Sequence, residues 1–134
     1  MAKESEYYNW IFVFGSNLAG IHGGGAAKYA FEHYRAKWGK GEGLQGNSYA
    51  LPTKDENVNS LGLDAIKKYV IRFLQHAGKQ KHTAYKVTAI GCGLAGYKPE
   101  EIGPMFELAP DNCLMPPEWK NVKELQGKKF WRYP

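Results

Sequence analysis

Cysteine is scarce in this chain: its 134 residues include only Cys92 and Cys113. Two cysteines cannot form the disulfide framework that holds small secreted domains together, which favours a reducing compartment. The chain also lacks a stretch of about 20 apolar residues that could span a membrane. Its first ten residues, MAKESEYYNW, lack the apolar centre of a signal peptide. We therefore expect a cytoplasmic protein with no membrane partner.

Metal-ligand patterns are missing as well. The four histidines, at positions 22, 33, 76 and 82, and the two cysteines do not show the spacing of a zinc site. The first glycine-rich segment, residues 15–25, has neither the Gly-Lys-Ser/Thr of a P-loop nor the Gly-x-Gly-x-x-Gly spacing of a dinucleotide-binding loop. We expect no metal and no bound cofactor.

Glycine and positive charge are what the chain has in excess. Most of its 16 glycines fall in three clusters, at 15–25, 39–46 and 91–96, where the backbone is expected to turn tightly or approach another group closely. The net charge of +5 suits an anionic partner such as a phosphate or a nucleic acid. A mildly basic balance without any specific partner is an equally good interpretation of the charge alone.

Strand-like and helical patterns alternate along the chain. Short apolar runs predict strands, and apolar residues spaced by about 3.6 positions predict helices. The predicted elements are, in order, a strand at 10–14, a helix at 27–38, a strand at 48–51, a helix at 66–77, a strand at 85–90 and a short helix from Pro99. Such alternation predicts an α/β fold, a three-layer α/β/α sandwich with a mainly parallel sheet. We expect one domain over 1–134, with an irregular C-terminal tail over about 116–134 and an edge strand at 113–115.

Two glycine clusters come directly after predicted strands. In open parallel sheets, ligands bind beyond the carboxyl ends of the strands. Consecutive glycines at a helix start let backbone N–H groups converge on an anion. The alternative, a tight turn alone, needs fewer glycines than these loops contain. We predict a phosphate-binding site formed by Gly15, Ser16, Asn17, Gly23, Gly24, Gly25, Gly91, Cys92, Gly93, Leu94, Ala95, Gly96 and Tyr97.

The pairing of these loops resembles the macro domain, an ADP-ribose-binding family. The resemblance covers roughly residues 10–108 and rests on Asn17 with the glycines at 23–25, and on GlyCysGlyLeuAlaGly at 91–96 followed by Tyr97 and Pro99. More narrowly, the runs at 14–27, 43–55 and 90–97 resemble a compact macro-like group of phage and bacterial proteins of uncharacterised function.

The resemblance implies roles for particular residues. Asn17 would face the distal ribose, the glycines at 23–25 would hold the diphosphate, and residues 91–96 would contact both, with Tyr97 stacking near the sugar. The chain departs from the family in two places. It has no Gly-Asp-Ile segment, where the family keeps an Asp that reads adenine, and Ala27 stands where some ADP-ribosyl hydrolases have a catalytic Asp.

Four side chains are candidates for chemistry at this edge. Lys54 could neutralise a phosphate, and Asp55 could bind a ribose hydroxyl or activate water; a solvated loop is the alternative for both. His22 could act as an acid or base, and Asn17 is a further catalytic candidate. Cys92 lacks a neighbouring base, so we expect it to pack beneath a ligand rather than to act as a nucleophile.

The predicted function is therefore binding of a small anionic nucleotide, ADP-ribose or a related NAD-derived nucleotide. Hydrolysis of an ADP-ribosyl or phosphoester bond remains open. One rival is nucleic-acid binding through the basic, aromatic end at 128–133, because cations and aromatic rings bind single strands. The other is a phage structural or assembly protein without nucleotide chemistry.

Overall fold

A five-stranded sheet with β1 at its centre organises the fold of the computed structural model, which describes residues 7–133. The strand order is β2-β3-β1-β4-β5, and only the β2–β3 pair is antiparallel. The polar start at 1–6 and Pro134 of the predicted tail lie outside the described residues. The strands are β1 (Asn9–Asn17), β2 (Gly43–Gln45), β3 (Ser48–Lys54), β4 (Thr83–Val87) and β5 (Cys113–Leu114).

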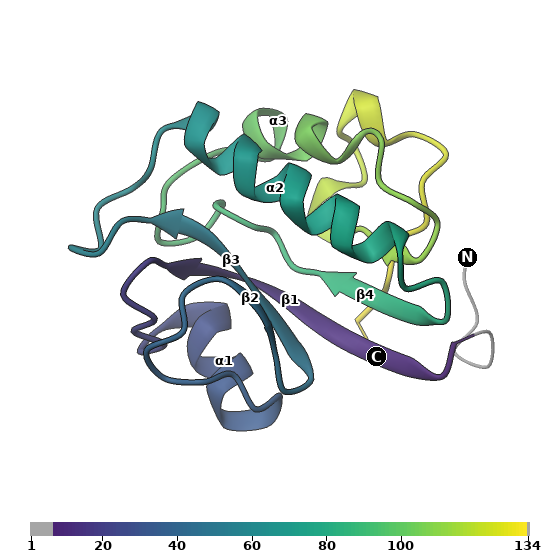
Figure 1. Ribbon diagram of the computed structural model, residues 1–134. Coiled ribbons are helices and arrows are strands. Elements are labelled where there is room, and N and C mark those ends of the chain that lie inside the picture. The colour runs from purple at the N-terminus through teal and green to yellow at the C-terminus, as the bar shows by residue number, and fades with distance from the viewer. Residues whose placement is uncertain (1–6, 134) are drawn as a thin grey trace.

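Helices lie on both faces of this sheet. Figure 1 shows α1 on one face, with α2 and α3 on the other, as an α/β sandwich requires. The predicted α/β class with a mainly parallel sheet is therefore confirmed. The helices are α1 (Gly25–His33), α2 (Leu63–Gly78) and α3 (Pro99–Ile102), with 3-10 turns η2 (Gly103–Phe106), η3 (Pro117–Trp119) and η4 (Lys123–Leu125).

Strand β1 has apolar residues on both faces because each face supports a separate core. Ile11 and Val13 pack into the larger cluster, under α2, while Phe12 and Phe14 pack with the alanines of α1. Side chains alternate between the two faces of a strand. The continuous apolar run at 10–14 is thus explained, and the strand predicted there is confirmed and lies at the centre of the sheet.

Helix α1 ends earlier than predicted. Its last residue is His33, not a residue next to Gly39, because Arg35 adopts a left-handed conformation with φ 60°. The N–H groups of Tyr34 and Ala36 both donate to the Ala30 carbonyl and close the helix there. The chain then turns back, so that the Gly39 N–H donates to the Gly20 carbonyl at 2.9 Å.

The glycine-rich connection at 39–46 is structured rather than a plain linker. It contains β2, which pairs with β3 over Ser48–Ala50. Strand β3 continues through Pro52 to Lys54, past the predicted end at 51. Proline is tolerated at that position because β2 no longer pairs there and leaves β3 with one neighbour, β1.

The C-terminal region is irregular in secondary structure but well packed. The predicted edge strand is present as β5, parallel to β4. The predicted tail adds η3 and η4, and buries Trp119, Val122 and Leu125 in the larger core. Among the described helices, none combines the length and apolar character needed to cross a bilayer.

Candidate functional site

A cavity of about 930 Å³ lies beyond the carboxyl ends of β1, β3 and β4. Both glycine loops contribute to its wall, which confirms the prediction that they meet at one edge of the sheet. The predicted site residues that line the cavity are Gly15, Ser16, Asn17, Gly23, Gly24, Gly25, Lys54, Gly91, Cys92, Gly93, Leu94 and Ala95. Its volume is within the usual range for small-molecule sites.

The side chain of Asn17 fixes the conformation of the first glycine loop. Its Nδ2 donates to the Ile21 carbonyl at 2.8 Å, and its Oδ1 accepts from the Ile21 N–H at 2.9 Å. These two bonds fix the chain reversal between β1 and the glycines at 23–25. Asn17 lines the cavity but is 7% exposed, so the structure gives it a clear part in shaping the loop.

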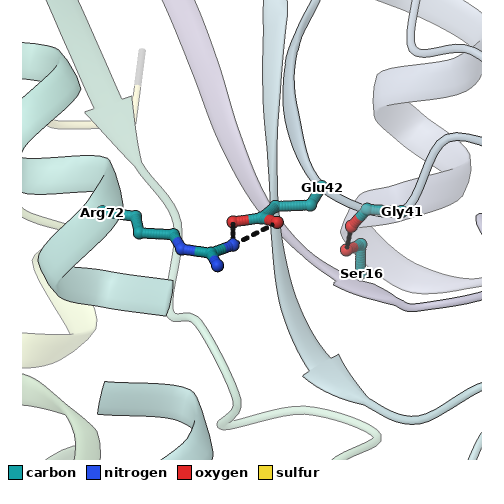
Figure 2. Close-up of polar contacts among 4 residues, drawn as sticks. All are labelled: Ser16, Gly41, Glu42 and Arg72. Atoms are coloured by element: carbon teal, nitrogen blue, oxygen red, sulfur yellow. Dashed lines mark hydrogen bonds and ion pairs between the residues drawn. The ribbon is translucent and has the colours of Figure 1, made fainter. Parts of the chain in front are cut away.

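The end of β1 is also tied to the connection before β2. The Ser16 hydroxyl donates to the Gly41 carbonyl, and the neighbouring Glu42 forms an ion pair with Arg72 of α2 (Figure 2). Gly41 and Glu42 are thus anchored to two different parts of the fold. Gly41 thus lies directly beside Ser16, which lines the cavity.

The amino end of α1 presents unused N–H donors to the cavity. Gly24 is its N-cap, and neither a side-chain cap nor an acidic residue occupies its first turn. Across residues 7–133, the N–H groups of Gly24, Gly25 and Ala26 have no hydrogen-bond acceptor. Because the helix dipole adds a partial positive charge at this end, the arrangement suits an anion.

Three glycines in the cavity wall are not required by the protein's own geometry. Gly24 is extended (φ −154°), a conformation open to any residue, and a Cβ there would meet only the Leu94 Cδ1 at 3.4 Å. A Cβ on Gly23 would meet one atom, at 3.8 Å, and one on Gly93 nothing within 4 Å. The space around these three Cβ positions is therefore largely open, and all three residues line the cavity.

The second loop has a defined fold of its own. The Gly96 N–H donates to the Gly93 carbonyl and the Tyr97 N–H to the Gly91 carbonyl. Residues 91–96, GlyCysGlyLeuAlaGly, have the Gly-x-Gly-x-x-Gly spacing that the first loop lacks. The loop follows β4 and precedes α3, a helix of only 4 residues. The pattern is thus placed between a strand and a helix, without a full-length helix behind it.

Cys92 lines the cavity as a half-buried thiol. Burial raises its pKa, with smaller contributions from nearby carboxylates, including Glu100. Its Sγ lies 3.4 Å from the Ile90 carbonyl, and no histidine is among the lining residues of the described chain. A raised pKa keeps the thiol protonated, which disfavours nucleophilic chemistry.

The expectation that His22 acts inside the cavity needs correction. Its side chain is 1% exposed and is not part of the cavity wall. The ring packs edge-on against Phe14 and near Trp38, and its Nε2 lies 2.8 Å from the Lys37 carbonyl. His22 therefore supports the first loop from behind.

Asp55, Gly96 and Tyr97 also lie outside the cavity wall, contrary to the prediction. The Asp55 Oδ1 accepts from the N–H groups of Asn57 and Asn59, so the carboxylate organises its own loop. The Tyr97 hydroxyl donates to the Leu61 carbonyl at 2.6 Å and ties the second loop to the segment before α2. Both residues shape neighbours of the cavity instead of facing a ligand.

Lys54 lines the cavity as predicted. The cavity has a further wall, which we did not predict from the sequence. That wall includes Glu118 of η3 and, from the C-terminal tail, Trp131 and Tyr133. Lys54 and Glu118 are the two charged residues among the lining residues of the described chain. The aromatic tail was noted in the sequence, but no local signal indicates that it returns to the sheet edge.

Comparisons with family models, with curated proteins and with solved structures find no match to this chain. The interpretation of the cavity therefore depends on its own residues.

Proposed function

We propose that this domain is macro domain-like and binds ADP-ribose or a related NAD-derived nucleotide, with the diphosphate between the two glycine loops. The observation that carries the proposal is the set Gly23, Gly24 and Gly93. Neither backbone conformation nor packing demands glycine at these positions, and all three residues line the cavity. Close approach of a ligand to the backbone accounts for all three.

The donors at the cavity support a diphosphate in particular. Free N–H groups at the start of α1 line the same cavity as the second loop, whose Gly-x-Gly-x-x-Gly spacing suits a pyrophosphate at a strand–helix junction. Lys54 adds one cation. The motif resemblance to the macro domain points to the same ligand class, and a cavity of about 930 Å³ has room for more than a phosphate ion.

Binding is favoured over hydrolysis. A hydrolase of this kind needs a base within reach of the bond to be cleaved. The candidates His22 and Asp55 are outside the wall, and burial raises the pKa of the Cys92 thiol. Glu118, the carboxylate among the described lining residues, accepts a hydrogen bond from the Tyr133 hydroxyl. In the basic, aromatic end that suggested nucleic-acid binding, Lys128 donates to the Ala109 carbonyl and the Trp131 indole to the Val87 carbonyl, so both side chains have partners within the domain.

The test compares two glycines that share a structural role. Gly24 and Gly62 are both extended helix N-caps, of α1 and α2, but only Gly24 lines the cavity. Gly24→Val should weaken ADP-ribose binding by about 10- to 150-fold, the equivalent of one charge-assisted hydrogen bond of about 1.5–3 kcal/mol. Gly62→Val should bind like the wild type, since its side chain meets no ligand.

Isothermal titration calorimetry with ADP-ribose measures both affinities, and circular dichroism checks that the variants fold. Wild-type protein that binds no ADP-ribose up to millimolar concentration would overturn the proposed function. Equal affinity in folded Gly24→Val protein would show that the ligand does not approach the α1 start.

A further inference from the structure

The C-terminal tail supplies one wall of the cavity. Trp131 and Tyr133 line it, together with Glu118 of η3. The tail reaches this place by pairing beyond β5: the Met115 N–H donates to the Lys129 carbonyl, and the Trp131 N–H to the Met115 carbonyl. Three residues remote from both glycine loops in sequence therefore share the same cavity.

The Trp131 side chain is held by a hydrogen bond that replaces a missing backbone hydrogen bond of the sheet. Strands β4 and β5 pair in the register Tyr85↔Cys113 and Lys86↔Leu114. If this pairing continued, the residue that donates to the Val87 carbonyl would be Pro116. Proline has no N–H, so this hydrogen bond of the sheet is missing. The Trp131 Nε1–H takes that place, at 2.7 Å from the Val87 oxygen. The Lys86 Nζ lies 4.4 Å from the indole centroid. The ring is thus oriented before any ligand arrives, which lowers the entropic cost of stacking on it.

Glu118 and Tyr133 form a hydrogen-bonding group beside this ring. The Tyr133 hydroxyl donates to the Glu118 Oε2 at 2.6 Å, and its ring packs edge-on against Trp131 with centroids 5.0 Å apart. Within residues 7–133, the Glu118 Oε1 has no hydrogen-bond or ion-pair partner. A carboxylate oxygen only accepts, so this atom selects a ligand group that donates.

The cavity is therefore different at its two ends. Lys54 stands at the end of β3, on one side of β1, while Trp131 is bonded to the end of β4, on the other side. The first glycine loop and its free N–H donors follow β1, which lies between β3 and β4. A phosphate would be repelled by Glu118 and attracted toward α1 and Lys54.

We infer that Trp131, Tyr133 and Glu118 form a base-binding subsite, in which the planar base of the nucleotide stacks on the aromatic pair and donates a hydrogen bond to Glu118. The inference rests on the proposed function and deepens it. It selects nucleotides with a donor-bearing base over sugar phosphates and inorganic phosphates. It also assigns base recognition to residues outside the segment implied by the macro domain resemblance.

The test uses ADP-ribose and inorganic pyrophosphate, which lacks a base, with Trp131→Ala, Glu118→Gln and a control, Trp38→Ala. Trp38 is another exposed indole, 56% accessible, outside the cavity wall. Trp131→Ala should weaken ADP-ribose binding by about 5- to 150-fold, the equivalent of one stacked base. Glu118→Gln should weaken it less, and pyrophosphate binding, followed by NMR titration, should change less than about twofold in either variant.

A second measurement does not depend on the stability of the alanine variant. ADP-ribose should change the tryptophan fluorescence of the wild type and of Trp38→Phe, and the change should be absent in Trp131→Phe. Wild-type affinity in Trp131→Ala would overturn the subsite and leave the proposed function standing. An equal loss of ADP-ribose and pyrophosphate binding would also overturn it, because the role of Trp131 would then be structural. Absence of ADP-ribose binding by the wild type would overturn both.

Discussion

Gly41 is a position where the structure predicts a large effect of adding one methyl group. It is buried beside the end of β1, and an ideal Cβ there would lie 2.3 Å from the Asn17 carbonyl oxygen and 2.9 Å from Leu18 backbone atoms. The atoms that such a Cβ would meet all belong to the backbone, so they cannot move out of the way as the end of a flexible side chain could. Gly41→Ala must therefore push residues 39–42 away from β1.

The magnitude follows from two contributions. Overpacking of this kind costs about 1–3 kcal/mol, and loss of the hydrogen bond from the Ser16 hydroxyl to the Gly41 carbonyl adds about 1 kcal/mol. The free energy of unfolding should fall by about 2–4 kcal/mol, or about 8–16 °C in Tm at roughly 4 °C per kcal/mol for a chain of this length.

Thermal and urea unfolding followed by circular dichroism measure the change. The control is Gly78→Ala, at the end of α2, where a Cβ meets nothing within 4 Å. Alanine is the better helix former, so this control should gain up to about 0.5–1 kcal/mol. A Gly41→Ala protein as stable as the wild type would refute the close packing of the 39–42 segment against β1.

Two further predictions concern pH and salt. Burial and, to a smaller extent, Lys79 lower the pKa of His76 below its ordinary 6.5, so the unfolded chain binds a proton at His76 more readily than the folded chain. The free energy of unfolding should therefore fall as the pH drops below about 6.5. In His76→Gln, the urea midpoint of unfolding should change less between pH 7 and 5 than it does in the wild type. ADP-ribose affinity should depend only weakly on salt if backbone N–H groups supply most of the binding. A steep loss, such as the roughly 10³-fold drop between 50 and 200 mM expected for six or more phosphate contacts of a nucleic acid, would contradict that mode of binding.

The sheet could be predicted because its signals are local. The run at 10–14 is apolar throughout since Val13 and Phe14 face different cores, and the stripe of α2 is regular over its length. The glycine loops could be placed together because parallel strands end at one edge of a sheet. Strand β2 was missed because it has only 3 residues, one of them glycine, and exists through pairing with β3.

The rest of the site depends on contacts between distant residues. His22 stands beside the glycines in sequence, yet its ring turns away from the cavity to fill the space between Phe14 and Trp38. Trp131 enters the cavity wall because Pro116 leaves a carbonyl of β4 without a donor, 15 residues earlier in the chain. That this carbonyl lacks a backbone donor can be recognised only once the register of β4 and β5 is known.

The presence of Glu118 in the cavity wall is consistent with the way in which we propose the anion is held. Backbone N–H groups carry partial charges and act over a short range, so they bind a diphosphate by contact rather than by a field spread through the cavity. Lys54 is the single cation among the lining residues of the described chain. A site built from many lysines and arginines would neutralise a nearby carboxylate and make it useless for selecting a hydrogen-bond donor. With backbone donors at the start of α1 and Glu118 beside Tyr133, the proposed site would bind phosphate in one part and select a neutral, donor-bearing base in another.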